Sequence, residues 1–180
     1  MKSMSVGIIL CVCISVSFAS NKMPHSFVDK YIGDLLVGKD RIEKIVQLYG
    51  QGFSQKNFHG ETLCYHNARE QIDFRLSFHD GLLESVTISK TQDQETPEEC
   101  KGKSIESKHL ITGKGIQLGD TQKKVIDVYG KPGKRETKDG VLIFEYHTDY
   151  TEDPQVALFY DAYLYFIDDK LIKLVIHDGE

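Results

Sequence analysis

The residues of this chain that could do chemistry are few and widely spaced. His147, Asp161 and His177 fall on three predicted strands with their side chains on one face, and such a trio could bind zinc if the side-chain tips converged. Strand alternation alone does not bring the tips together, so we expect histidines beside an aromatic patch and no metal site. No serine sits in a Gly-x-Ser-x-Gly elbow, and no glycine-rich phosphate loop is present. The sequence therefore predicts a protein without enzymatic activity and implies no cofactor.

The first 19 residues have the pattern of a removable secretory leader. Lys2 gives a short basic start, and the apolar run Val6–Phe18 is too short to span a bilayer. Small residues, Ser17 and Ala19, stand at −3 and −1 of a cleavage site. A retained anchor is the alternative. We expect a periplasmic or secreted protein with no membrane span.

Two cysteines, Cys64 and Cys100, remain after the leader. An even pair in an oxidising compartment predicts a structural disulfide. A redox pair, the alternative, is typically spaced as Cys-x-x-Cys, which this pair is not.

The charge of the chain is acidic. The formal net charge is −5, and removal of Lys2 with the leader takes it to −6. Such a body argues against nucleic acid or anionic lipid as the main partner.

One stretch, Leu118–Pro132, has both signals of a short helix. Asp120 or Thr121 can cap its start, and the apolar stripe ends at Gly130, which suits the position just past a helix. A weaker copy of the stretch runs from Val37 to Gly50. Two copies of this pattern predict an internal repeat, in which the same structural unit occurs twice in tandem.

Three strand-like runs follow each predicted helix, and alternation of apolar and polar residues marks the longer ones. The runs are 61–66, 71–79 and 82–89, then 141–148, 156–167 and 170–177. The expected fold is α+β, with two tandem helix-plus-three-stranded antiparallel sheet units and helices on one sheet face. The expected boundaries are 20–90 for the first unit, 91–114 for a linker and 115–180 for the second unit. A further short helix is expected over 27–36.

The spacing of Leu118-Gly119-Asp120-Thr121, Val125, Tyr129-Gly130 and Pro132 resembles the SmpA/OmlA family, small lipoproteins of the bacterial outer-membrane protein assembly machinery. It is also similar to the tandem-repeat β-lactamase inhibitory proteins, which double the same kind of unit. The resemblance implies a two-layer fold and a non-enzymatic role in protein binding. The lipidated cysteine of the lipoproteins is missing here, and the inhibitors' binding loops do not match residue by residue, so no contact residues carry over.

The two predicted sheets differ on the face turned away from the helices. In the first unit that face is polar, whereas in the second it is apolar and aromatic, and Leu171 is expected on it. An apolar face of this kind is typical of an interface. The predicted partner-binding residues are Ile143, His147, Phe159, Tyr163, Tyr165, Val175 and His177.

Three interpretations of this face stay open. The first unit or the linker could cover it, another envelope or extracellular protein could bind it, or it could form a homodimer. The leading functional hypothesis is an exported protein-binding module, either inhibitor-like or an envelope-assembly accessory. The alternatives are a carrier for a small hydrophobic ligand between the units and a hydrolase with an unrecognised site.

Overall fold

A computed structural model describes residues 29–58, 60–91, 100, 104–149 and 159–179. The expected leader, residues 1–19, lies outside these ranges. Within them, no helix combines the length and the hydropathy that crossing a lipid bilayer requires.

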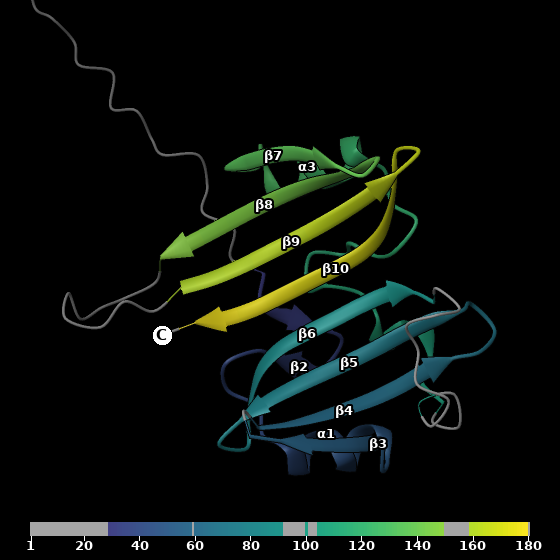
Figure 1. Ribbon diagram of the computed structural model, residues 1–180, viewed down its shortest axis with the longest axis vertical. Coiled ribbons are helices and arrows are strands. Elements are labelled where there is room, and N and C mark those ends of the chain that lie inside the picture. The colour runs from purple at the N-terminus through teal and green to yellow at the C-terminus, as the bar shows by residue number, and fades with distance from the viewer. Residues whose placement is uncertain (1–28, 59, 92–99, 101–103, 150–158, 180) are drawn as a thin grey trace, which may run out of the picture.

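The described elements are short helices and longer strands (Figure 1). They are β1 (Tyr31–Ile32), β2 (Leu35–Leu36), α1 (Ile42–Tyr49), β3 (Phe53–Asn57), β4 (Gly60–Asn67), β5 (Ile72–His79), β6 (Leu82–Lys90), the 3₁₀ turn η1 (Ser107–His109), α3 (Gln122–Tyr129), β7 (Lys134–Lys138), β8 (Val141–Asp149), β9 (Phe159–Ile167) and β10 (Lys170–Gly179).

The predicted fold of two helix-plus-three-stranded units is wrong. The protein is mostly β, and its main feature is one eight-stranded antiparallel sheet of order β3-β4-β5-β6-β10-β9-β8-β7. Each half of the chain contributes four strands to this sheet, and not the three that were predicted. The strands that the sequence analysis missed are β3 and β7. Both are polar edge strands without apolar alternation, and every residue of β7 is exposed. Lysines on such edges discourage pairing with other chains.

The two halves meet along β6 and β10 at the centre of the sheet. Antiparallel pairing runs from Ser89 opposite Lys173 to Ser85 opposite His177. Figure 1 shows the halves side by side, so the first half does not lie over the second. Of the three open interpretations of the aromatic face, cover by the first unit does not match this arrangement, and much of the predicted linker lies outside the described residues.

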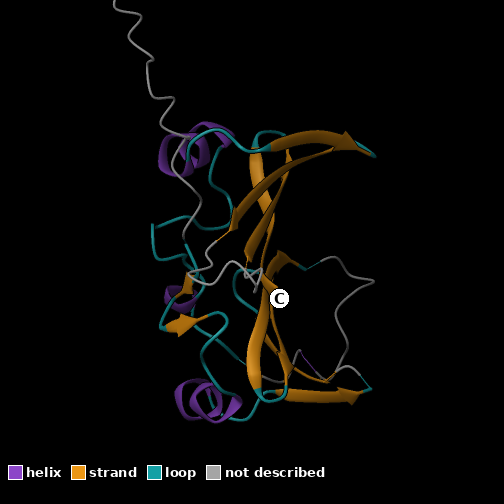
Figure 2. Ribbon diagram, turned by 90° about the vertical axis from the view of Figure 1, so that its left-hand side faces the viewer, coloured by secondary structure: helices purple, strands orange, loops and turns teal. Residues whose placement is uncertain are grey.

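Of the described helices, α1 and α3 lie where the sequence places them, and on the same side of the sheet (Figure 2). Each ends at a glycine with positive φ, Gly50 at 77° and Gly130 at 82°, where other residues would be strained. Their starts differ. The Thr121 hydroxyl accepts a hydrogen bond of 3.2 Å from the Lys124 backbone N–H, whereas Arg41 at the start of α1 makes no side-chain cap.

The helix expected over 27–36 is instead the two-stranded pair β1–β2. Gly33 between these strands has φ 54°, and a Cβ there would come within 2.8 Å of the His109 carbonyl oxygen. This pair and residues 104–118, most of which belong to the expected linker, complete the helix layer. Ile32, Leu35 and Leu110 are buried there, in one core that draws on both halves of the chain.

A buried polar network fixes α3 to two distant segments. The Tyr129 hydroxyl donates to Asp29 Oδ2 at 2.7 Å and lies 2.7 Å from the Thr112 hydroxyl. Asp29 also accepts a hydrogen bond of 2.9 Å from the Lys114 backbone N–H. Burial raises the pKa of Tyr129 well above its ordinary value, so this phenol stays neutral and keeps its proton to donate.

The two helix starts allow a paired test of capping. Thr121→Ala removes the cap of α3 and should lower the free energy of unfolding by about 1 kcal/mol. Arg41→Ser adds a cap to α1, so we expect a gain of several tenths of a kcal/mol up to about 1 kcal/mol. Urea unfolding followed by circular dichroism measures both. Equal effects of the same sign would contradict this reading of the two starts.

Candidate functional site

The candidate site is the sheet face opposite the helices, here called the outer face. Figure 2 shows that the sheet is curved and that both edge strands bend away from the helices, which makes this face the concave one. The side chains that alternate with the core supply it. On the six central strands they are Thr62, Cys64 and His66; Asp73, Arg75 and Ser77; Ser85, Thr87 and Ser89; Lys173, Val175 and His177; Asp161, Tyr163 and Tyr165; and Ile143, Glu145 and His147.

An apolar cluster lies at the centre of the second half of this face. Ile143 on β8 is opposite Tyr165 on β9, and Tyr163 is opposite Val175 on β10. All four side chains are partly exposed. Residues opposite each other on neighbouring strands have Cβ atoms about 5 Å apart, so this register brings the four residues into one patch, here called the aromatic patch.

Both phenols of the patch are neutral donors at physiological pH. Partial burial is the main cause that raises the pKa of Tyr163, and the Asp161 carboxylate raises it further. Burial also raises the pKa of Tyr165, and the Lys173 ammonium lies 5.2 Å from the centre of its ring. The patch therefore combines apolar area with hydroxyl groups and a nearby cation, a composition found at protein interfaces.

The other predicted residues lie around the patch. His147 is exposed, and its Nδ1 is 2.6 Å from Asp161 Oδ1 while its Nε2 is 2.9 Å from Asp149 Oδ1. The hydrogen bond with Asp161 is the main cause that raises the pKa of His147. The ring of Phe159 lies 5.4 Å from that of His147.

His177 points to a different place from His147. It lies opposite Asp161 in the sheet, but it lines a cavity of about 230 Å³ that reaches into the first half, beside Ser77 and Ser85. In the part of the chain that the structure describes, no group of three His, Cys, Asp or Glu side chains is arranged to hold a metal ion.

The expectation that Leu171 lies on this face is wrong. An irregularity in the pairing of β9 with β10 falls between Leu171 and Lys173, and it turns Leu171 into the core, where it is 1% exposed. A bulge adds one residue to a strand and reverses the side-chain alternation beyond it.

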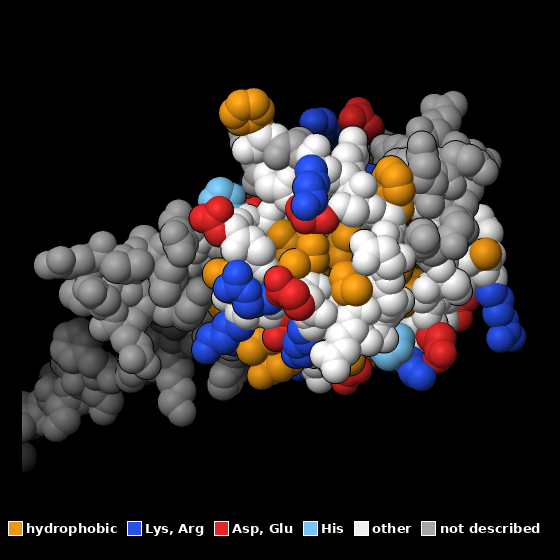
Figure 3. Space-filling model, turned by 90° about the horizontal axis from the view of Figure 1, so that it is seen from below, with side chains coloured by type: hydrophobic (Ala, Val, Ile, Leu, Met, Phe, Trp, Pro, Cys, Tyr) orange, Lys and Arg blue, Asp and Glu red, His pale blue; other side chains and the backbone are white. Residues whose placement is uncertain are grey.

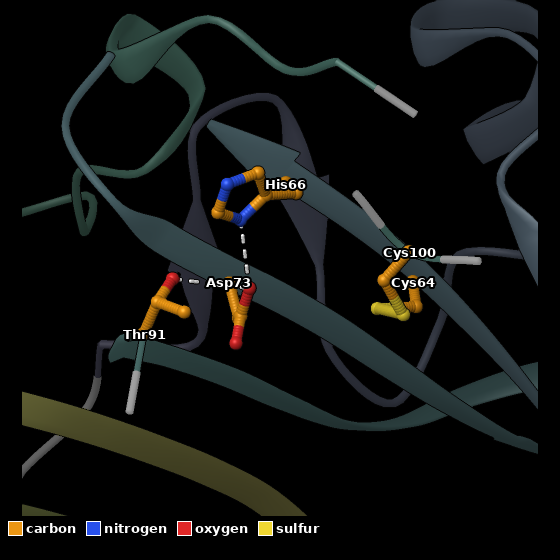
Figure 4. The surroundings of a disulfide bond; sticks show 5 residues. All are labelled: Cys64, His66, Asp73, Thr91 and Cys100. Carbon is orange, nitrogen blue, oxygen red and sulfur yellow. Dashed lines mark hydrogen bonds and ion pairs between the residues drawn. A yellow bond between two sulfur atoms is a disulfide. The ribbon is translucent and has the colours of Figure 1, made fainter. Parts of the chain in front are cut away.

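The predicted disulfide Cys64–Cys100 is confirmed, with 5.4 Å between the Cα atoms, and it lies on the first half of the outer face (Figure 4). Cys64 projects from β4 and is 4% exposed, and Cys100 is 1% exposed. Residues 104 and 66 also form a parallel β-bridge. Cys100 and Ser104 are therefore both joined to residues of β4.

A buried hydrogen bond between His66 and Asp73 lies beside the disulfide. His66 Nδ1 is 2.9 Å from Asp73 Oδ1, and the Thr91 hydroxyl donates to the same oxygen at 3.3 Å (Figure 4). Asp73 is 2% exposed, although its alternation with core residues along β5 predicts a solvent-exposed side chain. Alternation within β5 contains no signal of this burial.

A second apolar surface lies at the end of the molecule formed by α1 and β3. Figure 3 shows hydrophobic side chains in the middle of this end, surrounded by charged ones. Leu48 on α1 is 43% exposed, and Ile42 and Val46 are partly buried against the core. From the sequence, Ile42 and Val46 were expected only in the apolar stripe of the first short helix, and Leu48 was not singled out.

No protein-family model matches the chain, and no curated protein matches it by sequence. Solved structures with a similar arrangement include a DUF4309 family protein, YjgB, from Bacillus subtilis, with 12% identity and a TM-score of 0.45 over 81% of this chain and 82% of that one. A cysteine-rich secretory protein, SAV1118, from Staphylococcus aureus has 11% identity and a TM-score of 0.45, over 83% of this chain and 48% of that one.

A third solved structure is a candidate β-lactamase inhibitor protein from Streptococcus mutans, with 11% identity and a TM-score of 0.27 over 84% of this chain and 90% of that one. Likenesses at these values carry no argument about function. The resemblance to the SmpA/OmlA family stays a prediction.

The disulfide allows a test of what fastens the outer face. Cys64 and Cys100 are 36 positions apart, and closing a loop of this length stabilises a fold by about 4 kcal/mol in the chain-entropy model. The double variant Cys64→Ser/Cys100→Ser should lose stability of that order in urea unfolding. Reductant should destabilise the wild type and leave the variant unchanged. A wild type insensitive to reductant would contradict this role.

The protonation of His147 gives a second test. Because folding raises its pKa above 6.5, His147 contributes stability below pH 6.5, and this contribution is lost as the pH rises through the folded-state pKa. The stability difference between wild type and His147→Gln should therefore shrink as the pH rises. NMR titration of the imidazole gives the pKa directly. Asp161→Asn should lower it more than Asp149→Asn, and the reverse order would contradict the assignment.

Proposed function

We propose that the protein is a non-enzymatic protein-binding module that acts outside the cytoplasm and that the aromatic patch is the centre of its binding face. The observation that carries this proposal is the register that gathers Ile143, Tyr163, Tyr165 and Val175, all partly exposed, on the concave side of the sheet. Leaving apolar area in water costs about 25 cal/mol per Å², and a bound partner would recover that free energy.

The dimensions of the outer face favour a macromolecular partner. Eight strands about 4.8 Å apart make a face about 34 Å wide. A stable protein interface needs about 800 Å² from each partner, which a face of this width can supply. Tyrosines are frequent among residues whose truncation costs most binding energy, and Tyr163 and Tyr165 lie near the middle of the second half of the face.

The location supports an extracytoplasmic role. The disulfide Cys64–Cys100 belongs to an oxidising compartment, which fits the leader predicted from the first 19 residues. We propose the periplasm or the extracellular space as the site of action. Within it, the partner would be a protein that this module inhibits or helps to assemble.

Substituting the two tyrosines tests the proposal. Tyr163→Ser/Tyr165→Ser removes the centre of the patch and leaves the core-facing residues of β9 in place. We expect at least a tenfold weaker capture of the partner from an envelope extract, with an unchanged circular dichroism spectrum. Tyr31→Ser is the matched control, because Tyr31 is 48% exposed and lies in β1, in the layer of helices and loops away from the outer face.

A photo-crosslinking amino acid at position 163 identifies the contact directly. Adducts should form at position 163 and be absent at position 31. An adduct only with a second copy of the chain would show a homodimer interface in place of a partner site. No adduct at 163, together with unchanged capture by the double variant, would refute the proposal.

A further inference from the structure

Two buried polar atoms in the layer of helices and loops belong to rings that pack against each other. They are Nδ1 of His109, at the end of η1, and the hydroxyl oxygen of Tyr49, at the end of α1. Neither atom makes a hydrogen bond within the described residues, and the two ring centroids are 4.8 Å apart. Most buried side-chain polar atoms are paired, so two unpaired ones in contacting rings call for an explanation, of which a bound ion is one.

Asp34 brings a carboxylate to the same place. It lies in the turn between β1 and β2, and its Oδ2 is 3.7 Å from His109 Nδ1, which is too far for a hydrogen bond. The side chain of Asp34 is 67% exposed, whereas that of His109 is 19% exposed. The imidazole nitrogen is therefore buried behind a carboxylate that solvent can reach.

Backbone contacts hold the three elements that carry these side chains together. The Gly33 N–H donates to the Ile111 carbonyl oxygen at 2.8 Å, and a Cβ at Gly33 would come within 2.8 Å of the His109 carbonyl oxygen. The β1–β2 turn thus packs directly on the segment that carries His109. Lys44 on α1 donates to the Asp34 carbonyl oxygen at 3.1 Å, which fastens the helix to the same turn.

The carboxylate of Asp34 is available to a cation. Lys44, which contacts the Asp34 backbone, has its Nζ 2.7 Å from Asp40 Oδ2, so its charge is already paired. Within the described residues, the only ion-pair contact of the Asp34 carboxylate is the long one to His109. A neutral imidazole and a free carboxylate are both ligands that transition metals prefer.

We infer that His109 Nδ1, the Asp34 carboxylate and the Tyr49 hydroxyl oxygen bind a divalent transition-metal ion such as Zn²⁺. Zinc bonds to nitrogen and oxygen are about 2.1 Å long, so two ligand atoms of a tetrahedral zinc lie about 3.4 Å apart. The 3.7 Å between His109 Nδ1 and Asp34 Oδ2 is close to this separation. Tyr49 supplies the third ligand, and a water molecule can take the fourth position.

The electrostatics of Tyr49 favour a cation at this point. Burial raises the pKa of Tyr49 to about 12, and the negative charge of Asp34 contributes to the rise. A metal ion beside the phenol opposes both effects, because it favours the ionised form. On binding, the phenol forms a bond from oxygen to the metal and releases its proton to the buffer. The ion joins the β1–β2 turn, α1 and η1, away from the outer face, so the inference does not depend on the proposed function.

Titration of the wild-type protein with Zn²⁺ tests the site, with the imidazole C–H resonances followed by NMR. We expect saturable shifts of the His109 resonances and a tyrosinate band in the ultraviolet difference spectrum. Mg²⁺ is the control, because it prefers sites made of oxygen ligands only. No response of His109 to Zn²⁺ would overturn the inference, and so would an equal response to Mg²⁺, which would show screening of Asp34 only.

Variants assign the ligands. Tyr49→Phe keeps the ring and removes the oxygen, so it should abolish the tyrosinate band and weaken Zn²⁺ binding at least tenfold. Asp34→Asn changes an exposed side chain and should weaken binding by a similar factor. The matched control is His79→Gln, which removes the histidine of an exposed pair with 3.9 Å between His79 Nε2 and Asp80 Oδ2 and should bind as the wild type does.

Two results with these variants would contradict the site. Unchanged Zn²⁺ affinity in either Tyr49→Phe or Asp34→Asn would remove that residue from the ligand set and overturn the inference. A loss in His79→Gln as large as in Asp34→Asn would show that zinc binds to surface histidines in general. Circular dichroism spectra identical to that of the wild type would show that each variant is folded.

Discussion

The pairing of β6 with β10 is the constraint on which the rest of the structure depends. Each half of the chain folds a helix and four strands, and each would leave one long apolar strand at the edge of its own sheet. Pairing along Ser85–Ser89 and Lys173–His177 gives both strands a neighbour on each side. The edges that remain, β3 and β7, are short and polar. Short, largely polar edges of this kind discourage pairing with further strands at both ends of the sheet.

The same junction merges two small cores into one. A helix of eight residues on a four-stranded sheet buries little apolar surface, whereas the joined sheet supports one core across both halves. Residues 104–118 and the pair β1–β2 fill the space between α1 and α3. The two halves are also joined by a hydrogen bond to the backbone: the Tyr160 hydroxyl on β9 donates to the Val37 carbonyl oxygen at 3.2 Å. Neither half therefore has a complete hydrophobic core of its own.

The sequence predicts local features of this fold well and non-local ones poorly. Alternation and glycine positions predict α1, α3 and the six long strands, because these signals lie within each element. They miss β7, whose residues Lys134–Lys138 are all polar, and they cannot reveal the pairing of β6 with β10. The side-chain directions of the aromatic patch follow from alternation. The inward turn of Leu171 depends on pairing across strands, which alternation within one strand does not reveal.

One continuous sheet also places the two halves of the outer face in a fixed relation. Arg75, Thr87, Val175 and Tyr163 follow one another across β5, β6, β10 and β9 in a single row of paired residues. Three strand spacings separate the first from the last, which is about 14 Å. The row joins the first half of the outer face to the aromatic patch of the second half. Because the row runs through the β6–β10 junction, its spacing is set by backbone hydrogen bonds and does not depend on flexible loops.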